Sequence, residues 1–453
     1  MPRSKDRVIL IISFILFLAI NGYLSIIHEP WRDEIHAWLM AKYMNIPDMI
    51  LFSRYEGHPL LWHFILMPFA KLGAPVWVMS LISYAMVSVS AYIFLFRIKW
   101  NTAAKIITLF TIPFLYTYSA VARNYCLILL LGMIIAVMYE KRYDHPFLYS
   151  IPVTLMVFTH AMAWGFVAGL TITFHIYEIG RFILKRSQID KKRTVLTLAG
   201  LIMIAIATIT VIITLYGGVG FGFSVSENGD TNMLVISMVS IMAVIAVYVC
   251  LKARKNIREM LILVMSFSFM IVIYKTVYSS ILLQRLVLVQ VFLLFFALCT
   301  YEEGRKTDNL LAIGVFFISF VINGSIIDTV YYISEDITGN YSSGKEMGEY
   351  IRENLPDETV ILADAGNYAQ SVMPYIDQDI YDIKNEKFIK DNMYVVREDE
   401  NLVISAIQDI PNHEEYKGKY IIMFYAFENS PFEEIYRTSG SIMGEDYTLY
   451  YIP

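Results

Sequence analysis

The stretch VILIISFILFLAINGYLSII, residues 8–27, decides the fold class of this chain. It runs for about 20 residues without a charged side chain, which is the length that an α-helix needs to cross the hydrocarbon core of a bilayer. Arg3, Lys5 and Arg7 stand directly before it. No small-x-small cleavage site follows, so we expect an uncleaved first membrane span whose N-terminus is cytoplasmic.

The composition of the whole chain agrees with a membrane protein. Of its 453 residues, 57% are hydrophobic and only 17% are charged, whereas soluble globular proteins carry about 25% charged residues. This balance excludes a disordered chain, a nucleic-acid binder and an ordinary cytosolic enzyme. The three cysteines all lie in apolar stretches, so neither a disulfide framework nor a thiolate metal site is expected.

Further apolar stretches predict ten more membrane spans, which makes about eleven in total. They cover residues 75–96, 103–121, 125–139, 147–160, 161–180, 194–215, 234–251, 260–281, 286–300 and 310–330. The basic residues support this alternation, because twenty of the 27 Lys and Arg in residues 1–330 fall in segments that it places on the cytoplasmic side. The predicted protein is a multi-pass plasma-membrane protein, and the odd span count places its C-terminal segment outside the cell.

Two segments are too short for simple spans. Pro59–Gly73 is apolar over only about 15 residues, so we expect a short re-entrant or interfacial helix within the first outer loop, residues 28–74. The stretch 147–160 is also short, and we expect it to form a helical hairpin with 161–180 that places His160 at the outer tip.

Charge divides the chain into a transmembrane domain, residues 1–330, and an extracytoplasmic domain, residues 331–453. The first carries a net charge of +10 and the second a net charge of −15. The acidic segment is expected to be an α/β domain, since its about 120 residues are long enough to bury a core. We predict a helix over 344–354, followed by strands at 359–363, 394–397, 420–425, 435–438 and 447–452.

Polar side chains gather in the predicted outer loops, whereas the span interiors are nearly free of charge. The first group is Asp33-Glu34, which a helix begun by Pro30 would place in its first turn. The two carboxylates point about 100° apart on such a helix, so one could face a site while the other makes a structural bond. The plain alternative is a solvated helix start beside an interfacial aromatic belt.

The remaining polar groups each have a structural alternative as well. They are Arg32 and His36, Glu56 and His58, Arg123 with Asn124 and Tyr125, His160, Lys275, and Arg285. A turn before a helix explains Glu56 and His58, snorkelling or anchoring at the membrane interface explains Arg123, Lys275 and Arg285, and His160 could be an interfacial histidine with satisfied hydrogen bonds. What favours a functional site is that all these groups are predicted on one side of the membrane.

In their order along the chain, these motifs resemble the GT-C superfamily of membrane glycosyltransferases. The most similar branch contains the protein O-mannosyltransferases and the lipid A aminoarabinose transferases. The motifs are Trp31-Arg32-Asp33-Glu34-Ile35-His36-Ala37-Trp38, Gly57-His58-Pro59-Leu60-Leu61, Ala122-Arg123-Asn124-Tyr125, Phe158-Thr159-His160 and Gln284-Arg285-Leu286. The chain departs from the common pattern at Leu60, where relatives carry a second proline, and at Asn124, where many carry an acidic residue.

The resemblance implies an inverting hexosyl- or pentosyltransferase that acts in cell-envelope glycosylation, in the manner of a mannosyltransferase. Its donor would be a sugar on a polyprenyl phosphate, and its acceptor a lipid, glycan or protein; membrane lipids surround it and nucleic acid takes no part. The implied base is Asp33, with Glu34 second. The implied phosphate ligands are Arg123, His160, Arg285 and Lys275, and the implied sugar or acceptor ligands are Arg32, His36, Glu56, His58, Asn124 and Tyr125. No cofactor is expected, and Asn124 speaks against a divalent metal.

Two other functions stay open from the sequence. A transporter or flippase for lipid-linked glycans would show internal repeats and polar groups in mid-span, and the sequence has neither. A non-catalytic assembly protein would keep the fold without the chemistry.

Overall fold

The computed structural model describes most of the chain. It covers residues 4–215 apart from 57, 112 and 185–189; residues 259, 262–266, 268 and 283–301; and residues 326–453 apart from 340, 364–368, 392–409, 411–412, 425–430 and 442. The chain divides into two compact units. The helical unit comprises Met1–Gly22, Ser53–Trp62 and Ser83–Ile326, and the mixed unit comprises Tyr23–Phe52, His63–Ile82 and Ile327–Pro453.

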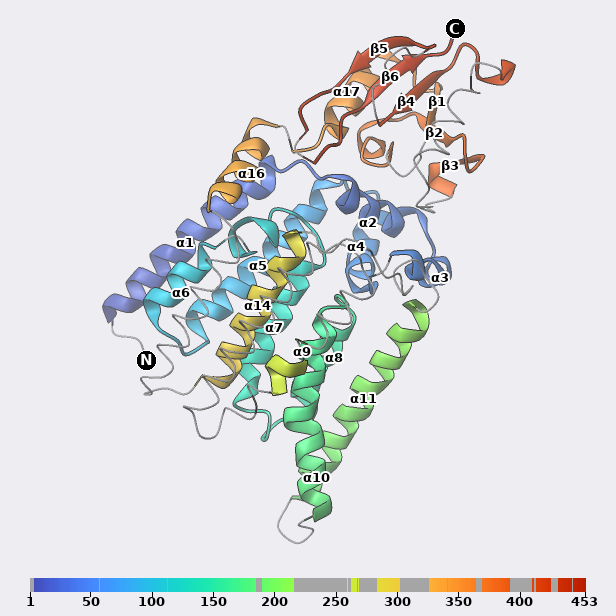
Figure 1. The fold of residues 1–453 in the computed structure, drawn as a ribbon. Coiled ribbons are helices and arrows are strands. Elements are labelled where there is room, and N and C mark those ends of the chain that lie inside the picture. Colours follow the sequence, from blue (N-terminus) through green and yellow to red (C-terminus); the bar gives the residue numbers. More distant parts are fainter. Residues whose placement is uncertain are drawn as a thin grey trace, which may run out of the picture. The chain divides into compact units, whose positions relative to one another are not determined.

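Four helices in the described residues are long and apolar enough to cross a membrane. They are Lys5–Ile27, which lies within α1 (Ser4–Ile27); Trp77–Phe96, which is α5; Ala163–Leu184; and Lys191–Leu215, which is α11 (Figure 1). Each overlaps a predicted span, at 8–27, 75–96, 161–180 and 194–215 respectively. The sequence-based expectation of a membrane protein with long apolar helices is thereby supported, while the full count of about eleven spans includes residues that the structure does not describe.

Helix α11 shows why these helices suit a bilayer rather than water. Its side chains Ile202, Ile206, Ile209 and Ile213 are all more than half exposed, and they follow one another at intervals of three or four residues on one face. The opposite face is buried and includes Gly200, Ile204, Ala207 and Val211. A continuous exposed apolar stripe of this kind is unfavourable in water and favourable against lipid.

Shorter apolar helices pack beside the long ones. They are α7 (Tyr125–Tyr139), α8 (Pro146–Val157) and the segment Val291–Thr300 of α14 (Leu283–Thr300). Helix α8 packs against α7 and α11, and α7 packs against α14. Glycines permit two of these approaches, because a Cβ atom at Gly200 would overlap Ser150 and one at Gly132 would overlap the ring of Phe295.

The predicted hairpin of 147–160 with 161–180 is observed. Helix α8 ends at Val157, His160 lies in the turn, and α9 (Ala163–Leu170) begins the return. The return helix continues through a π-helical segment, η2 (Thr171–Ile176), into α10 (Tyr177–Leu184).

The prediction of one continuous span over 103–121 is wrong. The structure has α6 (Thr102–Leu109), a break, and the π-helical segment η1 (Pro113–Thr117). Pro113 lacks a backbone N–H and its ring conflicts with the preceding helical turn, which explains why α6 does not run on. The predicted span 234–251, most of 260–281, and residues 310–325 of the predicted span 310–330 lie outside the described residues.

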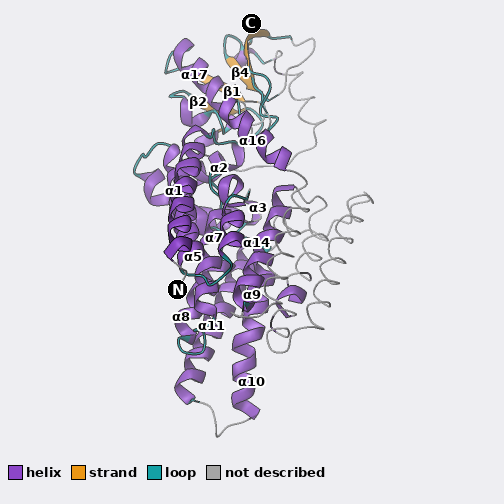
Figure 2. Ribbon diagram, turned by 90° about the vertical axis from the view of Figure 1, so that its left-hand side faces the viewer, coloured by secondary structure: helices purple, strands orange, loops and turns teal. Residues whose placement is uncertain are grey.

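The mixed unit contains a six-stranded sheet with the order β3-β2-β1-β4-β6-β5 (Figure 1). Strands β1, β2 and β4 are labelled in Figure 2, where strands are orange. Its strands are β1 (Val360–Ala363), β2 (Asp379–Asp382), β3 (Lys387–Phe388), β4 (Tyr420–Met423), β5 (Glu433–Arg437) and β6 (Thr448–Tyr451). The central strand β1 runs parallel to β2, with Leu362 beside Tyr381, and parallel to β4, with Leu362 beside Ile421; the other pairs are antiparallel. This confirms an α/β organisation for the C-terminal segment.

Most predicted elements of that segment lie where the sequence placed them. Helix α17 (Gly344–Asn354) matches the predicted 344–354 and buries Met347 and Ile351. Strands β1, β4, β5 and β6 match four predicted strands, the fifth (394–397) lies outside the described residues, and β2 and β3 were not predicted. The core is formed by Leu362, Ile410, Ile421, Met423, Phe432, Tyr450 and Ile452.

Helices from the first predicted outer loop belong partly to the mixed unit. They are α2 (Arg32–Tyr43), the start of α3 (Ile46–Glu56), and most of α4 (Leu61–Lys71). Helix α4 has 11 residues, or about 16 Å of rise, so it is too short to span and matches the short helix predicted at Pro59–Gly73. A further helix, α16 (Ile326–Thr338), runs through the expected domain boundary at residue 330.

Candidate active site

The first turn of α2 carries the motif that sequence reasoning singled out. Trp31, in an extended conformation, precedes the helix, and Arg32, Asp33 and Glu34 form its first turn. The carboxylate of Glu34 accepts a hydrogen bond from the Trp31 backbone N–H at 3.3 Å. This bond satisfies one of the backbone donors that a helix start leaves without an intrahelical partner.

Glu34 is fully buried and pairs with a histidine that also pairs with the C-terminal segment. The Nε2 atom of His28 lies 2.9 Å from Glu34 Oε2, and its Nδ1 atom lies 2.8 Å from Asp336 Oδ2 on α16. All three side chains are completely shielded from solvent. Burial lowers the pKa of His28, but the charges and hydrogen bonds of Glu34 and Asp336 outweigh it and raise that pKa to about 10. His28 is therefore an imidazolium that donates to both carboxylates.

Asp33, next to Glu34, has the opposite environment. Its side chain is 34% exposed, and its Oδ1 atom lies 3.8 Å from Nε of Arg32, which is 29% exposed. The two neighbouring carboxylates therefore point in different directions, as expected for successive residues of a helix. Glu34 makes a buried structural bond, and Asp33 reaches the surface of the unit.

A second carboxylate of the C-terminal segment binds the start of α2. Glu445 accepts hydrogen bonds from the Arg32 backbone N–H at 3.0 and 3.2 Å, and from the Ser342 hydroxyl at 2.8 Å. Burial raises the pKa of Glu445 to about 7, although the bonds from Ser342 and Arg32 oppose the rise. Glu445 thus places a buried hydrogen-bond acceptor at the start of α2, where backbone N–H groups have no intrahelical partner.

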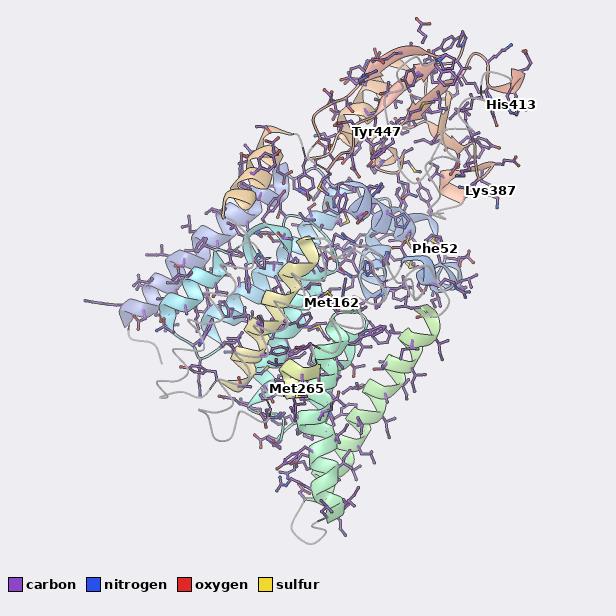
Figure 3. All side chains as sticks on the ribbon, in the orientation of Figure 1. Phe52, Met162, Met265, Lys387, His413 and Tyr447 are labelled. Carbon is purple, nitrogen blue, oxygen red and sulfur yellow. The ribbon has the colours of Figure 1, made fainter. Side chains whose placement is uncertain are left out.

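Two further contacts join the same segments. Glu29 accepts a hydrogen bond from the Lys345 backbone N–H at 2.8 Å, and burial raises the pKa of Glu29 to about 8. On the next turn of α2, His36 is buried and its Nδ1 atom lies 2.5 Å from Oε1 of Gln370. His36, which the resemblance assigned to substrate, therefore contacts a side chain of the C-terminal segment. Next to Gln370 in the chain, Ser371 shares a hydrogen bond with the hydroxyl of the buried Tyr447. Tyr447 is labelled in Figure 3.

A second group of predicted residues comes together in the helical unit. The ring of His160 lies 4.8 Å from that of His58 and 5.7 Å from that of Tyr125, measured between centroids. Asn124 donates to the Thr159 carbonyl at 2.8 Å, and the Arg123 guanidinium lies 5.5 Å from the Tyr125 ring centre. Three motifs that are far apart in the sequence therefore form one cluster, which we call the His58–His160 cluster.

The hairpin turn orients His160 within this cluster. Its Nδ1 atom accepts a hydrogen bond from the Met162 backbone N–H at 3.1 Å, and Met162 lies at the start of the return helix (Figure 3). Because that nitrogen accepts, the proton of a neutral imidazole is on Nε2. The Leu61 N–H donates to the Phe158 carbonyl at 3.4 Å, which joins the start of α4 to the same turn.

The other predicted residues are less defined. Glu56 ends α3 and is half-buried. Arg285 lies in the first turn of α14, but its side chain is outside what the structure describes, and Lys275 is outside the described residues altogether. In the described part of the chain, no group of three or more His, Cys, Asp or Glu side chains is arranged to hold a metal ion.

Sequence reasoning missed the residues that hold α2. They are His28, Asp336, Ser342, Gln370 and Glu445. His28 stands only three residues before the Trp31 motif, which is a weak local signal, but its partner Asp336 is 308 positions away. No periodicity or spacing in the sequence connects such positions.

Comparison with known proteins adds no family assignment. No protein-family model matches the chain, and no curated protein matches it. The resemblance to the GT-C superfamily therefore rests on the motifs themselves.

Proposed function

We propose that this chain is an inverting glycosyltransferase of the GT-C type, which moves a sugar from a polyprenyl-phosphate carrier to an acceptor at the outer face of the plasma membrane. The proposal includes the topology of about eleven spans, with a cytoplasmic N-terminus and an extracytoplasmic C-terminal domain. The observation that carries it is the contrast at the start of α2, where Glu34 is wholly buried and Asp33 is 34% exposed.

That contrast supports Asp33 as the base. Inversion in a single displacement needs one group that takes the proton of the acceptor hydroxyl. The hydroxyl oxygen then bonds to the anomeric carbon while the bond from that carbon to the phosphate oxygen breaks, and the polyprenyl phosphate leaves with the electron pair. Glu34, held by His28 at 2.9 Å, is committed to a structural bond. Asp33 lies in the same helical turn and its carboxylate is accessible.

The His58–His160 cluster supports a role in donor binding. Negative charge builds up on the phosphate as the bond to the sugar breaks, so cations and neutral hydrogen-bond donors both favour the transition state. Arg123 offers a planar fork that suits two phosphate oxygens, and we assign His160, Arg285 and Lys275 to the same task. The polar side chains of Arg32, Glu56, His58 and Asn124, with the ring of Tyr125, are assigned to sugar or acceptor hydroxyls. His36 is reassigned to support of α2, because it contacts Gln370.

A lipid carrier is consistent with the long apolar helices. Each buried methylene of a polyprenyl chain adds about 0.8 kcal/mol of membrane anchoring, so the donor is concentrated in the bilayer beside the enzyme. Such a donor also permits transfer outside the cell, where nucleotide sugars are absent.

The test uses the purified full-length protein in lipid nanodiscs, a set of polyprenyl-phosphate sugars, and a panel of lipid, glycan and peptide acceptors. The measured quantity is released polyprenyl phosphate. We expect release with one donor, and a loss of about 100-fold or more in Asp33→Asn, which is the range of general base catalysis. The matched control is Asp48→Asn, an exposed carboxylate in the first turn of the neighbouring helix α3, for which we expect wild-type rates.

Three outcomes would contradict parts of the proposal. No release with any donor would count against the enzyme, and movement of the intact donor between leaflets would then favour a flippase. Wild-type transfer by Asp33→Asn would remove Asp33 from the mechanism.

A further inference from the structure

We infer that Asp336 and Glu445 are positioning residues for Asp33, so that the C-terminal segment is part of the transfer machinery and holds the base-bearing helical turn in place. The inference rests on the proposed function, since it concerns the orientation of the proposed base. It gives the acidic C-terminal segment a role that no motif in it indicates.

The first argument is the placement of the contacts around Asp33. Glu445 bonds to the backbone N–H of the residue before Asp33, and Asp336 bonds through His28 to the residue after it. Both immediate neighbours of Asp33 in the chain are therefore tied to the C-terminal segment. Asp33 itself is the member of this turn whose carboxylate is left accessible.

The second argument is the cost of building such contacts. Three buried ionisable groups in a row require that each charge be compensated, because an uncompensated buried charge is expensive. His28, Glu34 and Asp336 are all at zero exposure, and a hydrophobic residue at these places would pack α2 more simply. What hydrogen bonds add over hydrophobic contacts is a defined orientation, and a base needs orientation to within fractions of an ångström.

The third argument is that more contacts fix the orientation of α2 than its attachment requires. His36, one turn further along α2, is 2.5 Å from Gln370, and Glu29, before α2, accepts from the Lys345 N–H at 2.8 Å. Residues at four positions, His28, Glu29, Arg32 and His36, are therefore connected to residues 336–445. Helix α2 is already packed through its buried apolar residues, so these polar contacts are not needed for its packing alone, whereas a base aimed at a hydroxyl needs them for its orientation.

The experiment compares Asp336→Ala and Glu445→Ala with wild type in the full-length protein. Ala at position 336 removes the oxygen that accepts from His28 and leaves His28 paired with Glu34 alone, and Ala at position 445 removes the oxygens that accept from the Arg32 N–H. Steady-state transfer is measured against donor concentration, and thermal unfolding is followed in parallel. We expect kcat to fall about tenfold or more in each variant while KM for the donor changes less than twofold. Asp357→Asn, an exposed carboxylate before β1, is the matched control and should leave both constants unchanged.

A second readout separates positioning from general damage. If Asp336 and Glu445 act through Asp33, neither substitution lowers the residual transfer of an Asp33→Asn protein further. An equal loss in both backgrounds, or an unchanged kcat in either single variant, would overturn the inference. If Asp336→Ala does not fold, Glu445→Ala decides by the same criteria, and if residual transfer is too slow to measure, the kcat and KM values decide.

The two proposals fail in different ways. Wild-type protein without transfer, or Asp33→Asn with full transfer, would overturn the proposed function or its base. Loss of transfer in Asp33→Asn with normal kcat in Asp336→Ala and Glu445→Ala would overturn only the positioning role.

Discussion

The polar groups at the start of α2 and the His58–His160 cluster are held by different interactions. At α2, buried charged groups meet through short hydrogen bonds, as in His28 between Glu34 and Asp336. In the cluster, the ring of His160 lies beside those of His58 and Tyr125, and the hydrogen bonds of Asn124 and of His160 Nδ1 are made with backbone groups. Directional charged bonds fix an orientation at a high desolvation cost, whereas ring contacts tolerate a wider range of orientations. The difference is consistent with the proposed roles of Asp33 as a base and of the cluster in donor binding.

The largest expected effect comes from removing the charge at the centre of the α2 contacts. His28→Ala leaves Glu34 and Asp336 buried without the imidazolium between them, and breaking a buried pair in this way costs about 3–5 kcal/mol. We expect a clear drop in the thermal unfolding midpoint of the detergent-solubilised protein. The control is His413→Ala, whose side chain is 54% exposed (Figure 3). Equal midpoints for the two variants would show that the α2 contacts do not differ from surface contacts.

A pH dependence of α2 should follow from the same contacts. The pKa of Glu445 is raised from 4.5 to about 7 in the folded protein, so the folded state binds this proton more tightly than the unfolded state. The resulting stability is complete below pH 4.5 and is lost as pH rises through 7; its size is on the order of 3 kcal/mol. Glu29 adds a loss of the same sign as pH rises through about 8, and His28 as pH rises through about 10.

Hydrogen exchange of the α2 amides, corrected for the intrinsic effect of pH, measures this dependence. We expect protection to fall between pH 5 and 8, and to fall less in Glu445→Gln, which cannot ionise. The amides of α8, beside the His58–His160 cluster, serve as the internal reference. Amide protection in α2 that does not change with pH would contradict the prediction. Protection that falls equally in α2 and α8 would show that the pH dependence is not specific to the contacts of α2.

The smallest expected effect concerns the cluster. Arg123→Lys keeps the positive charge but loses the planar fork that binds two phosphate oxygens, so we expect transfer to fall about tenfold with the unfolding midpoint unchanged. Lys99→Arg, an exposed basic residue in the helical unit, is the control. A large drop in stability for Arg123→Lys would mean that Arg123 supports the fold, and the contrast with His28 would then disappear.

Much of the local structure could be predicted from the sequence. Helix α7 has the predicted bounds 125–139 and α17 the predicted bounds 344–354, because apolar periodicity and capping residues act over neighbouring positions. The span predicted at 103–121 was wrong because hydrophobicity alone does not reveal the break that Pro113 introduces into a helix. The short strands β2 and β3 were missed, since Asp379–Asp382 carries polar residues at both ends and gives no strand pattern.

The candidate site was predicted only in part. The sequence motifs predicted that His58, His160 and the residues 123–125 belong to a functional site. The structure places these three motifs together. The contacts that hold Asp33 in place were out of reach, because His28 and Asp336 are 308 positions apart. Long-range pairs of this kind have no local signature in a single sequence.

The amino-acid sequence by itself determined that the chain is an apolar helical protein with an acidic α/β segment, because hydrophobicity and charge act on each stretch independently of the rest. Only the tertiary structure decided which of Asp33 and Glu34 is buried. Neighbouring carboxylates are chemically almost equivalent in the sequence, and their environments separate only when His28, Asp336 and Glu445 are brought beside them. Whether a charge can be buried depends on the partners that surround it, and those partners are assembled by folding.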